Sequence, residues 1–278
     1  MDGNSKYLDV KGISTHYHES GQGEPVLLIH GSGPGVTAWA NWRLIIPKLS
    51  ENFHVFAPDM VGFGYTERPE TIEYGVETWT NHLINFIEAV GQSNVHIIGN
   101  SLGGALALQI ANKRPDLVGK IVLMGAAGLP FKMTYGLYKV WGYEPSVENM
   151  KKLLEIFAYN QKFATDELAE LRYKASIQAG LQEAFSKMFA EPRQEKLNQL
   201  ALPEEQIKKI ENEVLMIHGR DDIVVPYQET SLKFLELLPN SELHIFSKCG
   251  HWTQIEKKDE FAKLCENFLL RNTTVINV

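Results

Sequence analysis

The chain has 278 residues, of which 44% are hydrophobic and 22% are charged. This length and apolar content can offset the chain entropy lost on folding, which excludes disorder as the main state. The formal net charge of −7, with Lys and Arg scattered, excludes the basic face typical of nucleic-acid-binding proteins. No run approaches the roughly 20 apolar residues of a membrane span, so we expect no membrane segment.

The first part of the chain predicts strands and then an alternation of helix and strand. Segments 7–10 and 13–18 flank Lys11-Gly12, a hairpin turn. The run 25–30 (PVLLIH) is apolar throughout, which is typical of strands buried on both faces of a parallel sheet. Beyond it we expect helices at 39–49, 76–90 and 102–113 and strands at 53–58, 94–99 and 118–123. This order predicts an α/β fold, mostly parallel, with helices on both faces of the sheet.

The strand pattern disappears between residues 129 and 209. That stretch predicts amphipathic helices, clearest at 150–159 and 167–181, with several prolines between them. Strands resume at 213–218 and 241–246, and helices follow at 228–237 and 256–270. We therefore expect residues 1–128 and 210–278 to form one core and residues 129–209 to form an inserted helical cap.

The clearest candidate for chemistry is the segment Gly99-Asn100-Ser101-Leu102-Gly103, which has the form GxSxG. A strand is predicted before it and a helix after it. At such a sharp turn the serine is exposed in a strained conformation, and the glycines are needed because a Cβ would collide with neighbouring elements. The motif predicts Ser101 as a nucleophile; the alternative is a glycine-rich turn with an idle serine.

A serine nucleophile needs a base within hydrogen-bond reach, and the chain has nine histidines. Most fall inside predicted strands or helices, and His30 and His218 end strands, where we expect structural roles. His251 lies instead on the loop after the last strand, at the edge of the sheet where ligands bind in α/β folds. We predict that His251 is the base.

The base in turn needs an acid that holds its tautomer. Two neighbouring aspartates, Asp221 and Asp222, follow the strand 213–218, and both cannot face one imidazole. We choose Asp222 because its spacing from Gly219 and Pro226 has the usual form of this acid loop, and we expect Asp221 in a turn. The order serine, aspartate, histidine is the one found in α/β-hydrolases.

An attacked carbonyl oxygen needs donors prepared for its negative charge. The backbone N–H groups of Leu102 and of Ser32, in the turn HGSGPG (30–35), are the candidates. The rival interpretation of this turn is a dinucleotide-binding loop. It fails because GxGxxG is not matched and Pro34 has no N–H.

Several longer phrases carry a resemblance to a known family. They are HGSGPGVTAWANW (30–42), APDMVGFGYTERP (57–69), GNSLGG (99–104), HGRDDIVVP (218–226) and FSKCGHW (246–252). Over residues 5–270 the chain resembles the α/β-hydrolase fold, and within it the meta-cleavage product hydrolases of aromatic degradation. The phrase HGSGPG is most similar to the monocyclic branch, which includes 2-hydroxymuconic semialdehyde hydrolases.

The resemblance implies roles for individual residues. Ser101, Asp222 and His251 would form the triad, with Ser32 and Leu102 as oxyanion donors. Arg172 falls where the family places an arginine that binds the dienoate end of the substrate. The remaining residues implied in substrate binding are Gly31, Asn41, Asn100, Phe157 and Trp252.

Each of these further residues has a simpler explanation. Arg172 on an amphipathic helix could be a solvated surface charge, and Asn41 a surface amide. Phe157 and Trp252 could be packing residues. A substrate with a carboxylate beside an enol oxygen would nevertheless need a fork-shaped cation, which a guanidinium supplies.

The reaction implied by the resemblance has two stages. The dienol first tautomerises to its keto form, with Arg172, Asn41 and Asn100 holding the carboxylate end and His251 moving a proton. The distal carbonyl is then attacked by Ser101, or by a water activated through Ser101 and His251, and the carbon–carbon bond breaks to give an acid and 2-hydroxypenta-2,4-dienoate. No cofactor is required, and the sequence offers no metal-ligand cluster.

Three other functions share some of these features. A carboxylesterase or lactonase would use the same triad but gain nothing from an anion-binding Arg172. A dehalogenase would carry Asp in place of Ser101. A noncatalytic binder of small molecules would not need the whole triad.

The remaining expectations concern the setting of the protein. Cys249 and Cys265 have no disulfide or metal spacing, so we expect reduced, buried thiols. The N-terminal segment lacks the pattern of a signal peptide, which favours a cytoplasmic protein. Its partner would be a small-molecule dienoate, with no nucleic acid and no membrane, and the resemblance implies a homo-oligomer.

Overall fold

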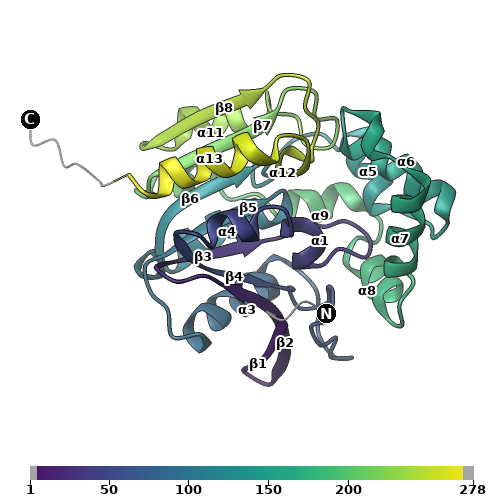
Figure 1. Ribbon diagram of the computed structural model, residues 1–278, viewed down its shortest axis with the longest axis horizontal. Helices are drawn as coiled ribbons and strands as arrows, with labels where there is room; N and C mark the ends of the chain where they lie inside the picture. The colour runs from purple at the N-terminus through teal and green to yellow at the C-terminus, as the bar shows by residue number, and fades with distance from the viewer. Residues whose placement is uncertain (1–4, 272–278) are drawn as a thin grey trace, which may run out of the picture.

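A single twisted sheet organises the computed structural model, which describes residues 5–271 (Figure 1). Its eight strands lie in the order β1-β2-β4-β3-β5-β6-β7-β8. They are β1 (Ser5–Val10), β2 (Ile13–Ser20), β3 (Glu24–Ile29), β4 (Phe53–Pro58), β5 (Val95–Asn100), β6 (Val118–Met124), β7 (Val214–Gly219) and β8 (Ser241–Phe246). The β1–β2 and β2–β4 pairs are antiparallel and the others are parallel. The predicted, mostly parallel α/β fold is confirmed.

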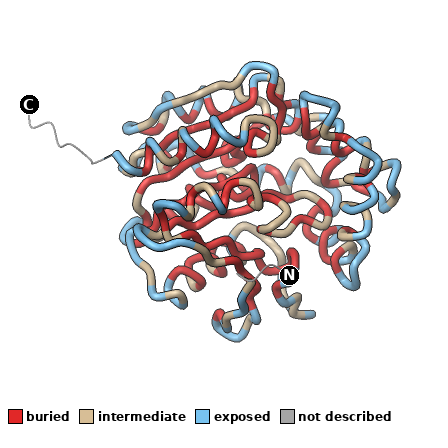
Figure 2. Tube along the Cα trace, in the orientation of Figure 1, coloured by how far each residue is buried: buried red, intermediate tan, exposed pale blue. Residues whose placement is uncertain are grey.

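Helices cover both faces of the sheet, and the strands that lie between these helices form the buried centre of the fold (Figure 2). On β3, Val26 and Leu28 join one apolar cluster while Leu27 and Ile29 join the other, because successive side chains of a strand point to opposite faces. The first cluster includes residues of α1 (Ala38–Trp42), α2 (Ile46–Leu49) and α13 (Lys258–Leu269). The second includes residues of α3 (Val76–Ala89), α4 (Leu102–Lys113) and α11 (Ser231–Leu237). A strand run that is apolar at every position, such as β3, is thus explained by burial on both sides.

The chain between β6 and β7 contributes helices to the described structure. They are α5 (Tyr135–Trp141), α6 (Val147–Phe157), α7 (Asp166–Ser176), α8 (Leu181–Met188), α9 (Arg193–Gln199) and α10 (Glu204–Ile207). Figure 1 shows α5–α8 gathered at one end of the sheet, next to the loop that leads into α12 (Thr253–Glu256). We call this inserted helical region the cap; the division into a core and a cap of residues 129–209 stays a prediction. The outer ends of the expected core, residues 1–4 and 272–278, lie outside the described residues.

Three predicted helices are shorter or divided. The helix expected at 39–49 is interrupted after Trp42 and restarts at Ile46, where Pro47 occupies the first turn and its missing N–H costs nothing. The helix expected at 167–181 ends at Ser176, and Gly180, with φ of 79°, separates it from α8. The last helix begins at Lys258 because α12 forms a separate turn. Within residues 5–271 no helix is long and apolar enough to cross a bilayer.

Both cysteines are free and buried, as predicted. Burial raises the pKa of the Cys249 thiol to about 12, and the neighbouring Glu256 carboxylate adds to the effect. Burial also raises the pKa of Cys265 above its ordinary value. Because the thiolate is the reactive form, we expect neither residue to react with a chromogenic disulfide reagent in the native protein. Both should react after unfolding in guanidinium; rapid modification of the native protein would contradict the burial described here.

Candidate active site

Ser101 lies at the turn between β5 and α4 with φ of 54° and ψ of −112°. This is the strained backbone expected of a nucleophile turn. A Cβ on Gly99 would lie 2.3 Å from the carbonyl oxygen of Gly103, and a Cβ on Gly103 would lie 2.3 Å from that of Ile29. The glycines are therefore required for the close approach of strand, turn and helix. The N–H of Leu102, the first residue of α4, has no acceptor within its own helix.

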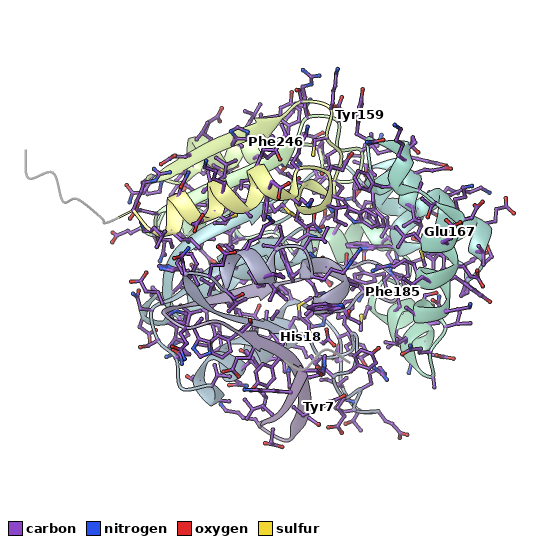
Figure 3. The ribbon with its side chains drawn as sticks, viewed as in Figure 1. Tyr7, His18, Tyr159, Glu167, Phe185 and Phe246 are labelled. Carbon is purple, nitrogen blue, oxygen red and sulfur yellow. The ribbon has the colours of Figure 1, made fainter. Side chains whose placement is uncertain are left out.

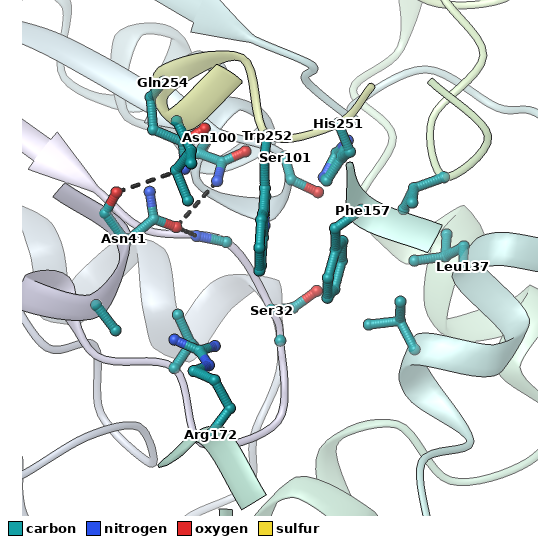
Figure 4. A pocket seen from close by; sticks show the side chains of 17 residues that line it. Ser32, Asn41, Asn100, Ser101, Leu137, Phe157, Arg172, His251, Trp252 and Gln254 are labelled. Carbon is teal, nitrogen blue, oxygen red and sulfur yellow. Dashed lines mark hydrogen bonds between the residues drawn. The ribbon is translucent and has the colours of Figure 1, made fainter. Parts of the chain in front are cut away.

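Asp222 and His251 meet across two loops at the same edge of the sheet. Nδ1 of His251 lies 2.7 Å from Oδ2 of Asp222. The other carboxylate oxygen accepts the backbone N–H groups of Val224 at 2.7 Å and Val225 at 3.0 Å, which fixes the carboxylate. Nδ1 of His251 therefore donates to Asp222, and Nε2 is left as the acceptor. Figure 4 shows the Ser101 side chain beside the His251 ring.

The neighbouring aspartate has a different partner. Oδ2 of Asp221 accepts the backbone N–H of Cys249 at 3.4 Å, so Asp221 braces the loop before His251. The structure therefore brings Asp222, and not Asp221, to the imidazole. This agrees with the choice made from the spacing of the acid loop.

A second histidine also contacts Asp222. Nε2 of His218 lies 3.1 Å from Oδ2 of Asp222 and 2.9 Å from the carbonyl oxygen of Val225, so it carries the proton, while Nδ1 faces the Ser231 hydroxyl at 2.7 Å. Burial opposes ionisation of Asp222, but the charge of His251 and the hydrogen bonds from both histidines outweigh it. Together they hold the pKa of Asp222 below its ordinary value. His218, expected to be structural, thus helps to hold the Asp222 carboxylate in place.

Two asparagines form a polarised pair at one end of the pocket. Oδ1 of Asn41 accepts the backbone N–H of Gly31 at 3.3 Å and Nδ2 of Asn100 at 2.9 Å (Figure 4). A backbone N–H can only donate, so it fixes the orientation of the Asn41 amide and, through it, that of Asn100. Nδ2 of Asn41 and Oδ1 of Asn100 are left buried and without a hydrogen-bond partner among the described residues. One donor and one acceptor are therefore available to a bound molecule.

Arg172 projects from α7 toward the same end of the pocket (Figure 4). Its Nε atom is buried without a hydrogen-bond partner, and no carboxylate of residues 5–271 forms an ion pair with it. Burial, and then repulsion from Arg43, lowers the pKa of Arg172 to about 10, so the side chain stays cationic at neutral pH. Arg172 is half-buried, and a partly desolvated cation without a counterion is stabilised when an anion binds beside it.

The opposite end of the pocket is apolar. Leu137, Val140 and Val224 line the pocket, and Figure 4 shows Leu137 and Arg172 on opposite sides of it, with Ser32 and Phe157 between them. The Phe157 ring lies over the His251 ring, with centroids 6.1 Å apart, and stacks on Trp252 at 5.0 Å. The pocket is therefore polar and cationic on one side of Ser101 and hydrophobic on the other.

The structure brings the predicted residues together from distant parts of the chain. Those that line one pocket are Gly31, Ser32, Asn41, Asn100, Ser101, Phe157, Arg172, His251 and Trp252. Of the other two, Leu102 follows Ser101 and Asp222 lies behind His251. Ser32 is further held by the Trp141 indole N–H, which donates to its hydroxyl at 2.9 Å. In residues 5–271 no group of three or more His, Cys, Asp or Glu side chains is placed to hold a metal ion.

Sequence reasoning missed several lining residues. Gln254, three positions after His251, lines the pocket, and its Nε2 donates to the carbonyl oxygen of Asn41 at 3.4 Å. Its place in the first turn after the histidine loop was the only available signal. The apolar residues Leu137, Val140 and Val224 carry no signal of their own, since nothing in their local pattern separates pocket from core.

Comparison with known proteins agrees with this geometry. A family model described as "alpha/beta hydrolase fold" matches residues 24–258. A 2-hydroxy-6-oxo-2,4-heptadienoate hydrolase of Pseudomonas putida is 53% identical, over 93% of each chain. A 2-hydroxymuconate semialdehyde hydrolase of a Pseudomonas species is 48% identical, over 93% of this chain and 91% of the relative.

The fold comparison reaches the same group. A solved meta-cleavage product hydrolase from Pseudomonas fluorescens, a serine-to-alanine mutant in complex with acetates, superposes with a TM-score of 0.94. It shares 53% sequence identity, over 95% of this chain and 97% of that chain. The chain therefore belongs to the α/β-hydrolase fold family and, within it, to the meta-cleavage product hydrolases, serine-type enzymes that hydrolyse a carbon–carbon bond.

Proposed function

We propose that this hydrolase cleaves 2-hydroxy-6-oxohexa-2,4-dienoates whose 6-substituent is small, with Ser101, Asp222 and His251 as its catalytic triad. The observation that carries the proposal is the half-buried guanidinium of Arg172, with its Nε enclosed and no carboxylate partner within residues 5–271, in the pocket that also holds Ser101 and His251. A substrate that is anionic at one end satisfies that charge. Its distal carbonyl then extends toward the serine and the apolar side of the pocket.

In the first stage the bound dienol becomes its keto form. Arg172 and Nδ2 of Asn41 hold the carboxylate, and Oδ1 of Asn100 accepts from the 2-hydroxyl group. His251 moves the proton from that hydroxyl to C5, so the 2-oxygen becomes a carbonyl and C5 becomes saturated. This stage prepares a stabilised carbanion as the later leaving group.

In the second stage the carbonyl at C6 is attacked. The nucleophile is Oγ of Ser101, or a water that Ser101 and His251 deprotonate, and Nε2 of His251 takes the proton. The N–H groups of Ser32 and Leu102 stabilise the oxyanion. The C5–C6 bond then breaks, and its electron pair stays with the C5 fragment, which leaves as a dienolate. His251 donates its proton to this fragment and so gives the dienol. If Ser101 attacked, a water that His251 deprotonates then hydrolyses the acyl-enzyme and restores the serine. On either route one water is consumed, and the products are a carboxylic acid and 2-hydroxypenta-2,4-dienoate.

The size of the substituent is set by the apolar side of the pocket. Leu137, Val140 and Val224 are branched aliphatic residues that line the pocket, and we propose that they admit hydrogen or a short alkyl group beside the C6 carbonyl. Two relatives are named for the heptadienoate and for the muconate semialdehyde, and these two substrates carry small substituents of this kind. We therefore place the preferred substrate among the ring-fission products of monocyclic catechols.

The proposal is tested with the yellow ring-fission products of catechol, 3-methylcatechol and 2,3-dihydroxybiphenyl. We expect the dienolate absorbance to decay with the first two and much more slowly with the third, with kcat/KM as the measure. Equal or faster turnover of the biphenyl product would contradict the small acyl side. No decay with any of the three, from folded protein, would contradict the proposed function.

Arg172 separates the proposed reaction from simple ester hydrolysis with the same triad. Arg172→Ala is expected to lower kcat/KM for the dienoate about 10²-fold or more, because a buried anion loses its cation. The hydrolysis of a neutral ester such as p-nitrophenyl acetate should change little. Arg172→Lys keeps the positive charge but loses the paired N–H donors of the guanidinium, so it should retain part of the dienoate activity.

Lys174→Ala is the matched control for Arg172→Ala. Lys174 lies on the same helix, but it is exposed and forms an ion pair with Glu170. We expect this variant to resemble the wild type with both substrates. Equal loss of ester and dienoate turnover in Arg172→Ala would show that Arg172 supports the fold of the cap instead of the substrate.

Two broader expectations remain part of the proposal. Self-association as a dimer or larger homo-oligomer and a cytoplasmic location are proposed from the family resemblance. Sedimentation of the purified protein measures the first, and fractionation of producing cells measures the second.

A further inference from the structure

We propose that Glu256 is a positioning residue that joins the histidine loop to the cap and so holds His251 in place. Glu256 ends α12, five residues after His251. Its Oε1 accepts the backbone N–H of Gly250 at 2.7 Å and that of Tyr159 at 3.1 Å. Its Oε2 accepts the backbone N–H of Asn160 at 2.8 Å. One carboxylate thus binds the residue before the histidine and the second and third residues after the end of α6.

The same junction contains a direct backbone contact. The N–H of Trp252 donates to the carbonyl oxygen of Phe157 at 3.1 Å. A Cβ on Gly250 would lie 2.7 Å from that oxygen and 2.8 Å from the Tyr159 nitrogen, so the two segments touch. Figure 3 shows Tyr159 where the cap meets the segment between β8 and α12. On one side of His251, Trp252 is therefore bonded to the cap directly, and on the other side Gly250 is linked to it through the Glu256 carboxylate.

The aromatic stack explains why this junction matters for the imidazole. Phe157 is the last residue of α6, and its ring faces both His251 and Trp252. If the segment after α6 moves, the Phe157 ring moves with it and the packing over His251 is lost. Asp222 fixes one end of the imidazole from the core side, and Glu256 fixes the loop that carries it from the cap side.

A carboxylate suits this position better than an amide. Both oxygens of Glu256 accept, and together they satisfy three backbone donors. In Glu256→Gln the NH₂ group would face at least one N–H, so either the histidine loop or the cap segment loses its acceptor. Glu256 forms no ion pair with a Lys or Arg side chain of residues 5–271 within 4.0 Å, which assigns its charge to these N–H groups.

The inference rests on the proposed role of His251 as the catalytic base. It predicts a loss in kcat, because the imidazole would be misaligned by a fraction of an ångström or more. KM should change less, because Arg172 and Asn41 hold the substrate from α7 and α1, which Glu256 does not contact. A misplacement of about 1 Å costs on the order of 10²-fold in rate.

The test uses Glu256→Gln and Glu256→Ala in the full-length protein, assayed with the ring-fission product of 3-methylcatechol. We expect kcat to fall about 10-fold in the first and about 10²-fold in the second, with KM within about 3-fold of the wild type. Glu67→Ala is the matched control, since the exposed Glu67 also accepts one backbone N–H, that of Ser14 at 2.9 Å, far along the chain from the site. It should keep the wild-type kcat.

Amide hydrogen exchange supplies a readout that does not depend on activity. In Glu256→Ala the amides of Gly250, Tyr159 and Asn160 should lose protection together, whereas Glu67→Ala should leave them unchanged. Lost protection with an unchanged kcat would overturn the positioning role, and unchanged protection would overturn the contact itself. If the wild type fails to consume the dienoate, the proposed function fails, and the exchange experiment still decides whether Glu256 joins the two segments.

A double-mutant cycle with Phe157→Ala separates positioning from general stability. If Glu256 acts by seating Phe157 over His251, the double variant should lose much less than the product of the two single losses in kcat. Fully multiplicative losses, with equal melting temperatures, would overturn the proposed route through Phe157.

Discussion

Ser101→Ala is expected to lower kcat for cleavage of the dienoate on the order of 10⁵-fold, as in triads whose members act as a unit. The hydroxyl supplies either the nucleophile or the contact through which His251 activates water, and alanine supplies neither. The first stage does not use the hydroxyl, so the bound dienol should still tautomerise. The measurement is stopped-flow absorbance for loss of the dienolate together with chromatography for 2-hydroxypenta-2,4-dienoate.

The two readouts make the Ser101→Ala result specific. Loss of the dienolate signal without formation of the product is the expected pattern. Product formation at a rate near that of the wild type would contradict the assignment of Ser101. The melting temperature is a control for folding. Ser101→Ala leaves Gly99 and Gly103 of the strained turn in place, so its melting temperature should be close to that of the wild type.

Asp222→Asn is expected to lower kcat about 10⁴-fold. An asparagine can present its NH₂ group to Nδ1 of His251, which favours the tautomer with the proton on Nε2. That nitrogen faces Ser101 and could no longer accept its proton. The matched control is Asp221→Asn, because Asp221 accepts the N–H of Cys249 and does not contact the imidazole; the control should keep most of the activity.

The lowered pKa of Asp222 gives this variant a pH signature in stability as well. A carboxyl whose pKa is lower in the folded state stabilises that state above its unfolded pKa of about 4 and loses this contribution as the pH falls through its folded pKa. The melting temperature of Asp222→Asn should therefore lie below that of the wild type at pH 7, and the gap should narrow only in strong acid. A gap that is constant with pH would contradict the charge-based account.

The parts of the fold that could be predicted are those that repeat a local pattern. The apolar runs of β3, β5 and β7 indicate strands buried on both faces. The GxSxG turn identifies Ser101 because a side chain at either glycine would collide with the neighbouring backbone. Pro47, in the first turn of the restarted helix, and Gly180, between α7 and α8, were visible as residue types. The division of the two predicted helices was not visible, because it depends on how each helix packs against other elements.

The parts of the site that could not be predicted depend on contacts between distant segments. Nothing near Glu256 in the sequence indicates that its carboxylate binds the backbone of Tyr159, about a hundred positions earlier. The orientation of the Asn41 amide depends on the N–H of Gly31, and the bond from His218 to Asp222 depends on how the acid loop folds back on β7. The bonds of Glu256 and Asn41 use backbone groups, which nearly every residue offers, so they leave little trace in residue identity. The His218–Asp222 bond joins two side chains, but the sequence does not show that the loop brings them together.

The orientation of the substrate is tested most directly by a crystal structure of Ser101→Ala soaked with the ring-fission product of 3-methylcatechol. We predict that the carboxylate lies within hydrogen-bond distance of the Arg172 guanidinium and of Nδ2 of Asn41. The C6 carbonyl should then point at the N–H groups of Ser32 and Leu102, with its methyl group toward Leu137. A molecule bound in the reverse direction, with its carboxylate at the N–H groups beside residue 101, would contradict the account.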